Sequence, residues 1–494
     1  MKTNFDKNID LIINEIGAKS IVNIKKILMG KNKDINAAII FVSGLVNNDS
    51  IDRDVLTPLM FKVNEELILK ESTAEYICKR YIPMSGTIVE TDINKVIESI
   101  KSGKTAILID GVESFIVADT VGGERRSITD SPSESAIRGP REGFVENIEV
   151  NISMIRRRIK DKNLEIETFK LGRRSQTDLA LIYIEDIVDK DVLNEVRNRI
   201  MTIDVDLVDD TGVLEQYIED SSYSIFPQIY GTERPDIINA NLMEGRIAII
   251  LGGTPYVLTV PGIFVEFFQA VEDYNERMII SSFSRFLRII AIFIIITLPS
   301  IYLALIQYNA ELIPVKFINP IVQSRRGIAL TPLFEVLAME IVVEFLREGG
   351  LRLPPRIAST LSIVGGIIIG NTAIESKIVS PTTLLVVGIS VIATFLIPSY
   401  EMSLSIRFIR FPMLIITSAM GFLGLTAGVF FLIIHLFSLE SFGVPYICFK
   451  KSDMKDIFIR STSWKMNKRP ESIPNNNPIR QSDFRKQFRR NKNG

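Results

Sequence analysis

The chain contains few residues of the types that build disulfides, metal sites and hydrolase active sites. Its 494 residues include two cysteines and one histidine. Cys78 and Cys448 are too few, and too far apart in sequence, for a disulfide framework, so a reducing compartment fits. His435 is the only histidine and lies inside the last apolar segment, so we expect neither a Ser-His-Asp triad nor a histidine-rich metal site. We therefore expect no catalytic residue, no cofactor and no metal, and a membrane-tethered enzyme is the least favoured class of function.

Other common signals are missing as well. The first residues, MKTNFDKNIDLIINEIG, contain no continuous apolar core, so we expect no secretory signal. The formal net charge is −1, so overall charge does not indicate a nucleic-acid partner, and we expect none. Residues 102–105 read SGKT, like the end of a phosphate-binding loop, but Glu98 stands where that loop requires glycine. We interpret SGKT as a turn that leads into a strand.

The sequence up to residue 285 is typical of an α+β protein. Residues 1–35 form a polar lead-in, after which short runs rich in β-branched residues alternate with helical patterns. We predict two small αβ subdomains, at 36–140 and 161–285, joined by a linking helix at 141–160. The predicted strands are NAAIIFVSGLV, TAILIDG, SFIVADT, TDLALIYIEDIV, RIAIIL and PYVLTV.

A faint internal repeat supports two related subdomains. AIIFV beginning at Ala38 can be aligned with ALIYI beginning at Ala180. GKTAILIDG beginning at Gly103 can be aligned with GRIAIILGG beginning at Gly245, again 142 residues later. The alternative is a chance match, since apolar strands look alike. A true repeat would make this part a duplicated sensing or assembly unit rather than a single catalytic pocket.

Long apolar stretches fill residues 286–438. The first, 287–305, has 19 residues, which at about 1.5 Å each nearly cross a bilayer core of roughly 30 Å. We expect an α-helical membrane domain of four or five spans. The remaining candidate spans are 328–346, 357–374, 378–397 and 411–437.

The positions of the basic residues support two different numbers of membrane spans. Residues 439–494 form a basic tail that we expect to be cytoplasmic, and we expect its Lys- and Arg-rich part, 450–494, to be disordered and attracted to membrane lipid. Together with arginines before the first stretch, this tail favours four spans, with 328–346 re-entrant or interfacial. Arg347, Arg352 and Arg356 would then lie outside. Five spans would place these arginines inside and misplace the tail.

One apolar helix carries a glycine face. Gly365, Gly366 and Gly370 let another helix approach closely, so helix packing is the first interpretation. A pore-lining face in an oligomer is the second, and one helix in a ring can do both.

Another apolar stretch, 328–346, carries three carboxylates. Glu335, Glu340 and Glu344 are costly inside a bilayer unless they face water or a partner. The stretch is therefore expected either to lie at the interface or to line an aqueous path. We predict that Gly366→Leu or Glu340→Ala alters ion release without preventing membrane insertion.

Two dense polar turns are candidates for subunit contact or coupling. They read RGPREGF at 138–144 and GTERPD at 231–236. Arg and Glu held by Gly and Pro suit a defined ion pair between subdomains or subunits, and a solvated loop is the alternative. The candidate residues are Arg138, Arg141, Glu142, Glu233, Arg234 and Asp236.

Six segments carry a resemblance to one known family. They are IRGPREGFVENIEVNISMIRRRI (137–159), FPQIYGTERPD (226–236), GGTPYVLTVPGIFVEFF (252–268), LREGGLRLPPRI (346–357), GGIIIGNTAI (365–374) and SFGVPY (441–446). In order and spacing they resemble the A subunit of spore germinant receptors, the GerA-type spore germination proteins of endospore-forming Firmicutes. The resemblance covers nearly the whole chain from residue 36 to residue 446.

The resemblance implies a multi-pass subunit of the spore inner membrane, with the N-terminal domain and the tail in the cytoplasm. It implies two partners, a transporter-like B subunit that binds the nutrient and a lipoprotein C subunit. It also implies a homo-oligomeric ring, often taken to be a pentamer, that conducts monovalent cations and triggers germination. The alternative is an adaptor without a pore, which docks the B and C subunits and relays the signal to a separate channel.

Overall fold

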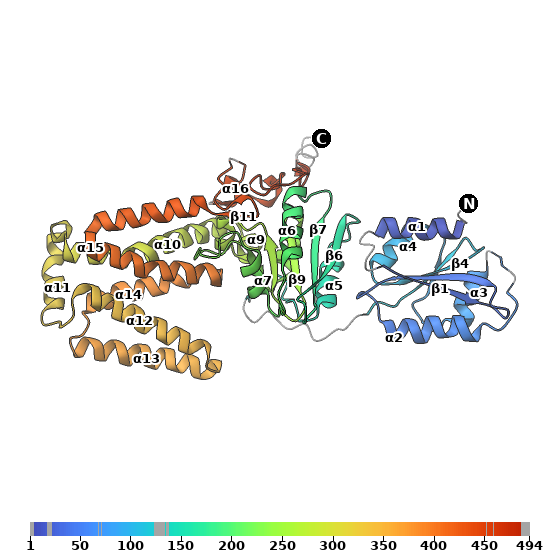
Figure 1. Cartoon of the computed structure of the whole chain (residues 1–494), viewed down its shortest axis with the longest axis horizontal. Coiled ribbons are helices and arrows are strands. Elements are labelled where there is room, and N and C mark those ends of the chain that lie inside the picture. Colours follow the sequence, from blue (N-terminus) through green and yellow to red (C-terminus); the bar gives the residue numbers. More distant parts are fainter. Residues whose placement is uncertain are drawn as a thin grey trace, which may run out of the picture.

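The computed structural model describes residues 4–16, 22–67, 69–70, 72–122, 134, 138–450, 452–457 and 459–485. Three parts follow one another along the long axis: a first αβ unit, a second αβ unit and a bundle of long helices (Figure 1). The C-terminal segment returns to the second αβ unit.

The first unit is an antiparallel five-stranded sheet with the strand order β1-β2-β4-β5-β3. Helices cover both faces, because neighbouring residues of the inner strands point to opposite sides. In β2, Ile39 packs with α2 and α3, and Ile40 packs with α1 and α4. The elements are α1 (Asn4–Ile16), β1 (Val22–Met29), β2 (Ile35–Val42), α2 (Asn48–Ile51) with helical turns to Lys62, α3 (Thr73–Tyr81), β3 (Ile88–Glu90), α4 (Ile93–Lys101), β4 (Thr105–Ile109) and β5 (Phe115–Ala118).

The second unit repeats the first. Its strand order is β6-β7-β9-β10-β8, and each strand begins 142 residues after its counterpart. The duplication predicted from two aligned segments is confirmed and extends to all five strands. The elements are α5 (Ile148–Arg158), β6 (Leu164–Leu171), β7 (Thr177–Ile184), α6 (Lys190–Thr202), α7 (Thr211–Ile218), β8 (Tyr230–Thr232), α8 (Pro235–Glu244), β9 (Ile247–Leu251) and β10 (Val257–Val260).

The repeat corrects two predicted boundaries. Residues 1–35 are not a lead-in, because α1 buries Ile12 and Ile16 in the first core and β1 pairs with β2. They looked polar because α1 is amphipathic and β1 is a half-exposed edge strand. The predicted linking helix, 141–160, is α5, the counterpart of α1, and it packs into the core of the second sheet.

The helical bundle begins after α9 (Val271–Asn275). By length and composition, two of its described helices can cross a membrane, α10 (Met278–Gln307) and α15 (Tyr400–Ser438), and α14 (Pro381–Thr394) is shorter and apolar. The others are α11 (Val315–Arg325), α12 (Pro332–Leu351) and α13 (Pro355–Glu375).

A sharp reversal divides α15 into two antiparallel halves (Figure 1). Gly421 has φ 61° and ψ −140°, a conformation reserved for glycine. Beyond the turn, Gly428 of the second half lies against Met413 of the first. The stretch 411–437, which we expected to form one span, therefore folds as a hairpin. Both ends of α15 lie beside the second αβ unit, and the turn lies at the opposite end of the bundle.

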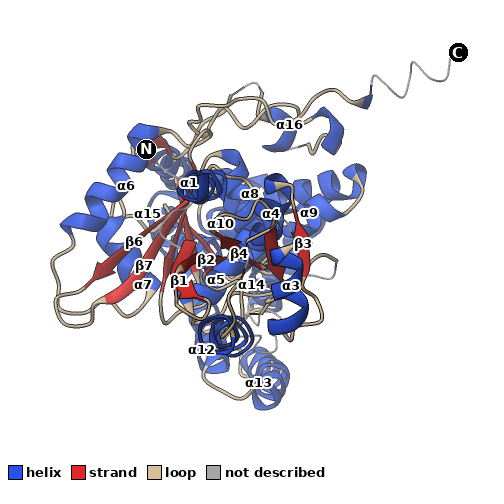
Figure 2. Cartoon of the chain, turned by 90° about the vertical axis from the view of Figure 1, so that its right-hand side faces the viewer, coloured by secondary structure: helices blue, strands red, loops and turns tan. Residues whose placement is uncertain are grey.

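The C-terminal segment is ordered over most of 450–485, contrary to the disorder that we expected for 450–494. After the hairpin β11 (Glu440–Ser441) and β12 (Val444–Pro445), it forms α16 (Met454–Ile457) and passes along one side of the second unit (Figure 2). Arg469 Nε donates a hydrogen bond to the Met243 carbonyl at 2.6 Å, and Asn475 forms a β-bridge with Val188. Composition suggested disorder, but these specific contacts hold the segment. Residues 486–494 lie outside the described residues.

Candidate functional site

Of the three candidate carboxylates on α12, two meet arginines of α15. Glu340 is fully buried, and its Oε2 lies 2.7 Å from Nη1 of Arg410, which is also buried. Glu344 lies 3.1 Å from Arg410 Nη2 and 3.3 Å from Arg407 Nη1. The charges of α12 and α15 therefore compensate each other inside the bundle.

The third carboxylate, Glu335, holds the opposite end of α12. One oxygen lies 2.7 Å from Arg325 Nη1 at the end of α11, and the other accepts a hydrogen bond of 2.6 Å from the Ser380 backbone N–H at the start of α14. Glu335 is fully buried and joins three helices. From the sequence, the stretch 328–346 was expected either to lie at the membrane interface or to line an aqueous path. The structure shows a different arrangement, in which the carboxylates pair with arginines of the same chain.

Sequence reasoning missed these arginines because they lie just outside the apolar stretches. The available signal was the segment SIRFIRF at 405–411, which places Arg407 and Arg410 one helical turn apart immediately before an apolar run.

The predicted glycine face is divided in the structure. A Cβ atom on Gly365 would lie 3.2 Å from Leu346 of α12, and one on Gly370 would lie 3.5 Å from Leu384 of α14. Around Gly366, no described atom lies within 4 Å of that position. Gly365 and Gly370 thus serve packing within the chain, and Gly366 faces away from it.

The two polar turns, 138–144 and 231–236, contact each other at the start of the second αβ unit. The Phe144 backbone N–H donates to the Glu233 carbonyl at 2.8 Å. Arg234, which is buried, pairs with Asp236 at 2.9 Å and donates to the Pro140 carbonyl at 3.0 Å. The resulting contacts lie within one chain.

The remaining candidates of these turns have separate surroundings. Glu142 pairs with Arg158 at the end of α5 at 2.6 Å. Arg138 and Arg141 have exposed side chains, and the Arg138 carbonyl accepts a hydrogen bond from Asn275 at 2.8 Å. The RGPREGF turn therefore presents the charges of these two arginines to solvent.

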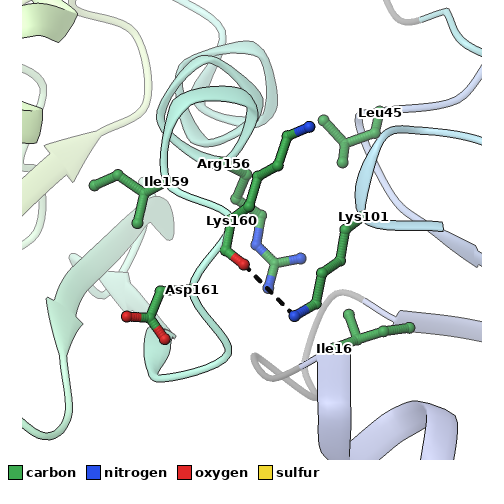
Figure 3. A pocket seen from close by; sticks show the side chains of 7 residues that line it. All are labelled: Ile16, Leu45, Lys101, Arg156, Ile159, Lys160 and Asp161. Carbon is green, nitrogen blue, oxygen red and sulfur yellow. Dashed lines mark hydrogen bonds between the residues drawn. The ribbon is translucent and has the colours of Figure 1, made fainter. Parts of the chain in front are cut away.

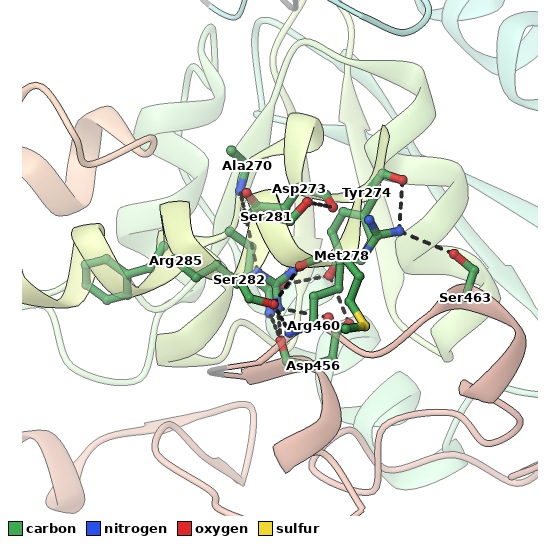
Figure 4. Close-up of polar contacts among 12 residues, drawn as sticks. Ala270, Asp273, Tyr274, Met278, Ser281, Ser282, Arg285, Asp456, Arg460 and Ser463 are labelled. Atoms are coloured by element: carbon green, nitrogen blue, oxygen red, sulfur yellow. Dashed lines mark hydrogen bonds and ion pairs between the residues drawn. The ribbon is translucent and has the colours of Figure 1, made fainter. Parts of the chain in front are cut away.

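A second ionic cluster, which the sequence did not reveal, joins α9, α10 and the C-terminal segment (Figure 4). Arg285 Nε lies 3.1 Å from Asp273, and Arg285 Nη1 lies 2.9 Å from Asp456. Arg460 donates to the Tyr274 and Glu276 carbonyls at 2.9 Å and 2.8 Å. We call these residues the junction cluster. They fix the first turns of α10 to the second αβ unit through a segment about 170 residues later in the chain.

A buried ion pair supports the same region from within the second unit. Arg246 at the start of β9 pairs closely with Glu266, and both side chains are buried. Burial raises the pKa of the Glu266 carboxyl, and the charge of Arg246 lowers it. Asn241 donates to Glu266 at 3.3 Å, so the carboxylate is held from two sides.

A small basic pocket lies between the two αβ units (Figure 3). Lys101, Arg156 and Lys160 line it, and Lys101 Nζ donates to the Lys160 carbonyl at 3.5 Å. Burial lowers the pKa of the Arg156 guanidinium to about 10. About 10 Å³ is open to the centre of a water molecule, which is room for about one water. In this conformation the pocket is too small for a nutrient molecule. Elsewhere, no group of three or more His, Cys, Asp or Glu among the described residues is placed to hold a metal ion.

The junction cluster leads to a prediction about the C-terminal segment. Asp456→Ala removes one of two carboxylates around the buried Arg285, so the unfolding free energy should fall by about 1–3 kcal/mol. Residues after 450 should also become more sensitive to limited proteolysis. Lys455→Ala, next to it but exposed, is the matched control and should change neither property. If both variants resist the protease equally well, the junction cluster does not hold the C-terminal segment in place.

Comparison with known proteins agrees with the order of segments described above. Residues 1–472 match the family model of the Bacillus/Clostridium GerA spore germination protein. Spore germination protein KA of Bacillus subtilis is 40% identical over 479 residues, which cover 96% of this chain and 88% of that protein. The uncharacterized membrane protein YfkQ of the same organism is 38% identical and is matched over 89% of this chain and 86% of its own length.

A solved structure is also similar, the N-terminal domain of the A subunit of the Bacillus megaterium spore germinant receptor GerK3. It is 32% identical, with a TM-score of 0.42, and covers 53% of this chain and 97% of that domain. From the family model and the identities over most of its length, the chain belongs to the GerA family of spore germination proteins.

Proposed function

We propose that this chain is the A subunit of a germinant receptor in the spore inner membrane, where several copies form a ring that conducts monovalent cations after a nutrient binds. It would act with a nutrient-binding B subunit and a lipoprotein C subunit. The names of its relatives support the role in germination, and the helical bundle supports the position in the membrane. The proposal that this chain forms a cation channel goes further than these two observations and depends on α13.

The directions of the helices support six crossings. From the side of the αβ units, α10 leads away, α12 returns, α13 leads away, α14 returns, and the two halves of α15 lead away and return (Figure 1). Ala329 before α12 donates to the Lys377 carbonyl after α13, so those two helix ends share the far side. Arg347 donates to Thr394, so the end of α12 and the end of α14 share the near side.

Six crossings remove the conflict between four and five spans. The αβ units, the C-terminal segment and the α12–α13 connection, which contains Arg352, then all lie on the cytoplasmic side. The positive-inside rule favours this placement of Arg352 and of the C-terminal segment. Lys316, Arg325 and Arg326 then lie on the far side, where Arg325 pairs with Glu335. The extra reversal at Gly421, hidden inside one apolar run, makes the count even.

One observation carries the channel proposal: α13 has a face that no described residue covers. Ile367 and Ile368 are each 58% exposed, and around Gly366 the described residues leave open space. Small residues on such a face allow the backbones of neighbouring copies to approach closely around a common axis. Glu335, Glu340 and Glu344 on α12 pair with arginines of the same chain. We therefore propose that α13 lines the ion path and that these carboxylates stabilise the helical bundle. In the alternative, a pore-less adaptor, the same face docks another subunit.

Native mass spectrometry of the purified chain in mild detergent tests the ring. Four to six copies would support a pore built by this subunit. A stable monomer or dimer would favour the adaptor and contradict the proposal.

The channel itself is tested with a pair of glycine variants. Gly366→Leu fills space that is open within one chain, so the chain should fold and insert, but nutrient-triggered cation release from spores should be largely lost. Gly388→Leu on α14 is the matched control, because a Cβ there also meets no described atom within 4 Å. It should leave release unchanged. Normal release by Gly366→Leu spores would argue against a path along α13.

A further inference from the structure

A closed loop of the second αβ unit, residues 221–228, carries one fully exposed tyrosine. Ser221 and Gln228 close the loop, since the Gln228 side chain accepts from the Ser221 N–H at 3.0 Å and donates to the Ser221 carbonyl at 2.9 Å. Within this loop, Tyr223 is 103% exposed, as much as in an unfolded chain. Among the exposed large apolar and aromatic side chains of the described residues, it is the most exposed.

Both halves of α15 hold this loop. Ser405 in the first half donates closely to the Ile225 carbonyl. His435 in the second half lies with Nε2 3.2 Å from Ser224 Oγ, and its ring is 6.0 Å from that of Phe226. Because contacts come from both sides, the position of the loop relative to the membrane helices is fixed.

The contacts also place the loop beside an exposed apolar surface of α15. His435 stands in the last turn of α15, among exposed apolar side chains such as Phe431 (68%) and Phe437 (59%). In the proposed topology, lipid covers this surface on the cytoplasmic half of the bilayer. Ser224, the neighbour of Tyr223, touches His435. Tyrosine combines an apolar ring with a polar hydroxyl and is enriched at this level of membranes.

We infer that Tyr223 inserts its ring into the phospholipid headgroup layer on the side of the αβ units, so that residues 221–228 anchor the second αβ unit to the bilayer surface. The inference rests on the proposed membrane topology. The partner is the boundary between headgroups and acyl chains of the surrounding lipid, and the exposed side chain of Ile225 next to it adds apolar area. Because the loop is bonded to both halves of α15, a shift of the αβ unit relative to the bilayer would act directly on these helices.

Tryptophan fluorescence in lipid vesicles tests the anchor. The chain has one tryptophan, Trp464, so Trp464→Phe provides a silent background. Full-length variants carrying Tyr223→Trp, Phe431→Trp or Phe61→Trp are reconstituted into phosphatidylcholine–phosphatidylglycerol vesicles with bromine either near the headgroup or deep in the acyl chains. Phe61 is 65% exposed in the first αβ unit and is the matched control for a side chain in water.

We expect the Tyr223→Trp reporter to emit at shorter wavelength than the Phe61→Trp reporter and to be quenched most by shallow bromine. Water-like emission without quenching would overturn the inference, and so would blue-shifted emission without quenching, because that result places the ring against another protein chain. The Phe431→Trp reporter shows whether a negative result contradicts the anchor alone or also the proposed membrane topology. If it is quenched by deep bromine while the position 223 reporter is not, only the anchor fails. If neither is quenched, the proposed membrane topology fails as well.

Discussion

Replacing Arg410 with alanine should lower the unfolding free energy of the detergent-solubilised chain by about 3–5 kcal/mol, the usual cost of leaving a buried charge without its partner. Arg410 is the largest fully buried side chain among the described residues, and it contacts both Glu340 and Glu344. Without Arg410, Glu340 keeps no ion-pair partner within 4 Å among the described residues. The measurement is the midpoint of thermal unfolding in one detergent.

Two controls show whether the loss belongs to the buried pair. Arg352→Ala removes an exposed pair with Glu348, so the unfolding free energy should change by less than about 1 kcal/mol. Glu340→Leu combined with Arg410→Met removes both charges and should recover most of the stability, since apolar replacement of a buried pair is often nearly neutral. If Arg410→Ala unfolds at the wild-type midpoint, the pairing of α12 with α15 is wrong.

This prediction also revises one made from the sequence alone. We expected Glu340→Ala to alter ion release while leaving insertion intact, as for a residue that lines a pore. The structure places Glu340 in an ion pair between α12 and α15. Altered release in this variant would therefore report a weakened bundle as well as a changed path, and only Gly366→Leu keeps the two apart.

Local patterns predicted the αβ part of the fold well. Strands such as β2 and β9 are short apolar runs rich in isoleucine. The spacing of Ala38 and Ala180 revealed the duplication because both residues lie in buried inner strands with the same apolar pattern. The boundaries failed at α1 and β1. These elements are amphipathic, and their polar residues dominate the average composition.

The candidate site depended on contacts that no local pattern contains. Glu340 and Arg410 are 70 positions apart, and only the return of α15 beside α12 brings them together. The glycine run likewise gave three equivalent candidates, and the neighbours Leu346 and Leu384 decide that Gly365 and Gly370 are packing residues. Without the tertiary fold, Gly366 cannot be distinguished from them.

Gly421→Leu should remove the reversal within α15 and transfer the C-terminal segment to the other side of the membrane. At φ 61° and ψ −140°, any residue other than glycine is strained by about 1–3 kcal/mol. A Cβ atom there would also lie 3.1 Å from the Tyr308 ring. Leucine favours the straight helix, in which the flanking halves continue into each other. On the proposed topology, the chain would then cross the membrane five times.

Cys448 lies ten residues after Ser438, the last residue of α15, and reports the side on which the segment emerges. In a Cys78→Ser background, a membrane-impermeant maleimide added to oriented vesicles should label wild-type Cys448 only from the side of the αβ units. In Gly421→Leu, a large share of Cys448 should be labelled from the opposite side. Gly428→Ala is the matched control, because its Cβ meets only the flexible Met413 side chain. Unchanged labelling in Gly421→Leu would contradict this prediction, because the junction cluster and Arg469, and not the glycine conformation, would then hold the C-terminal segment on the side of the αβ units.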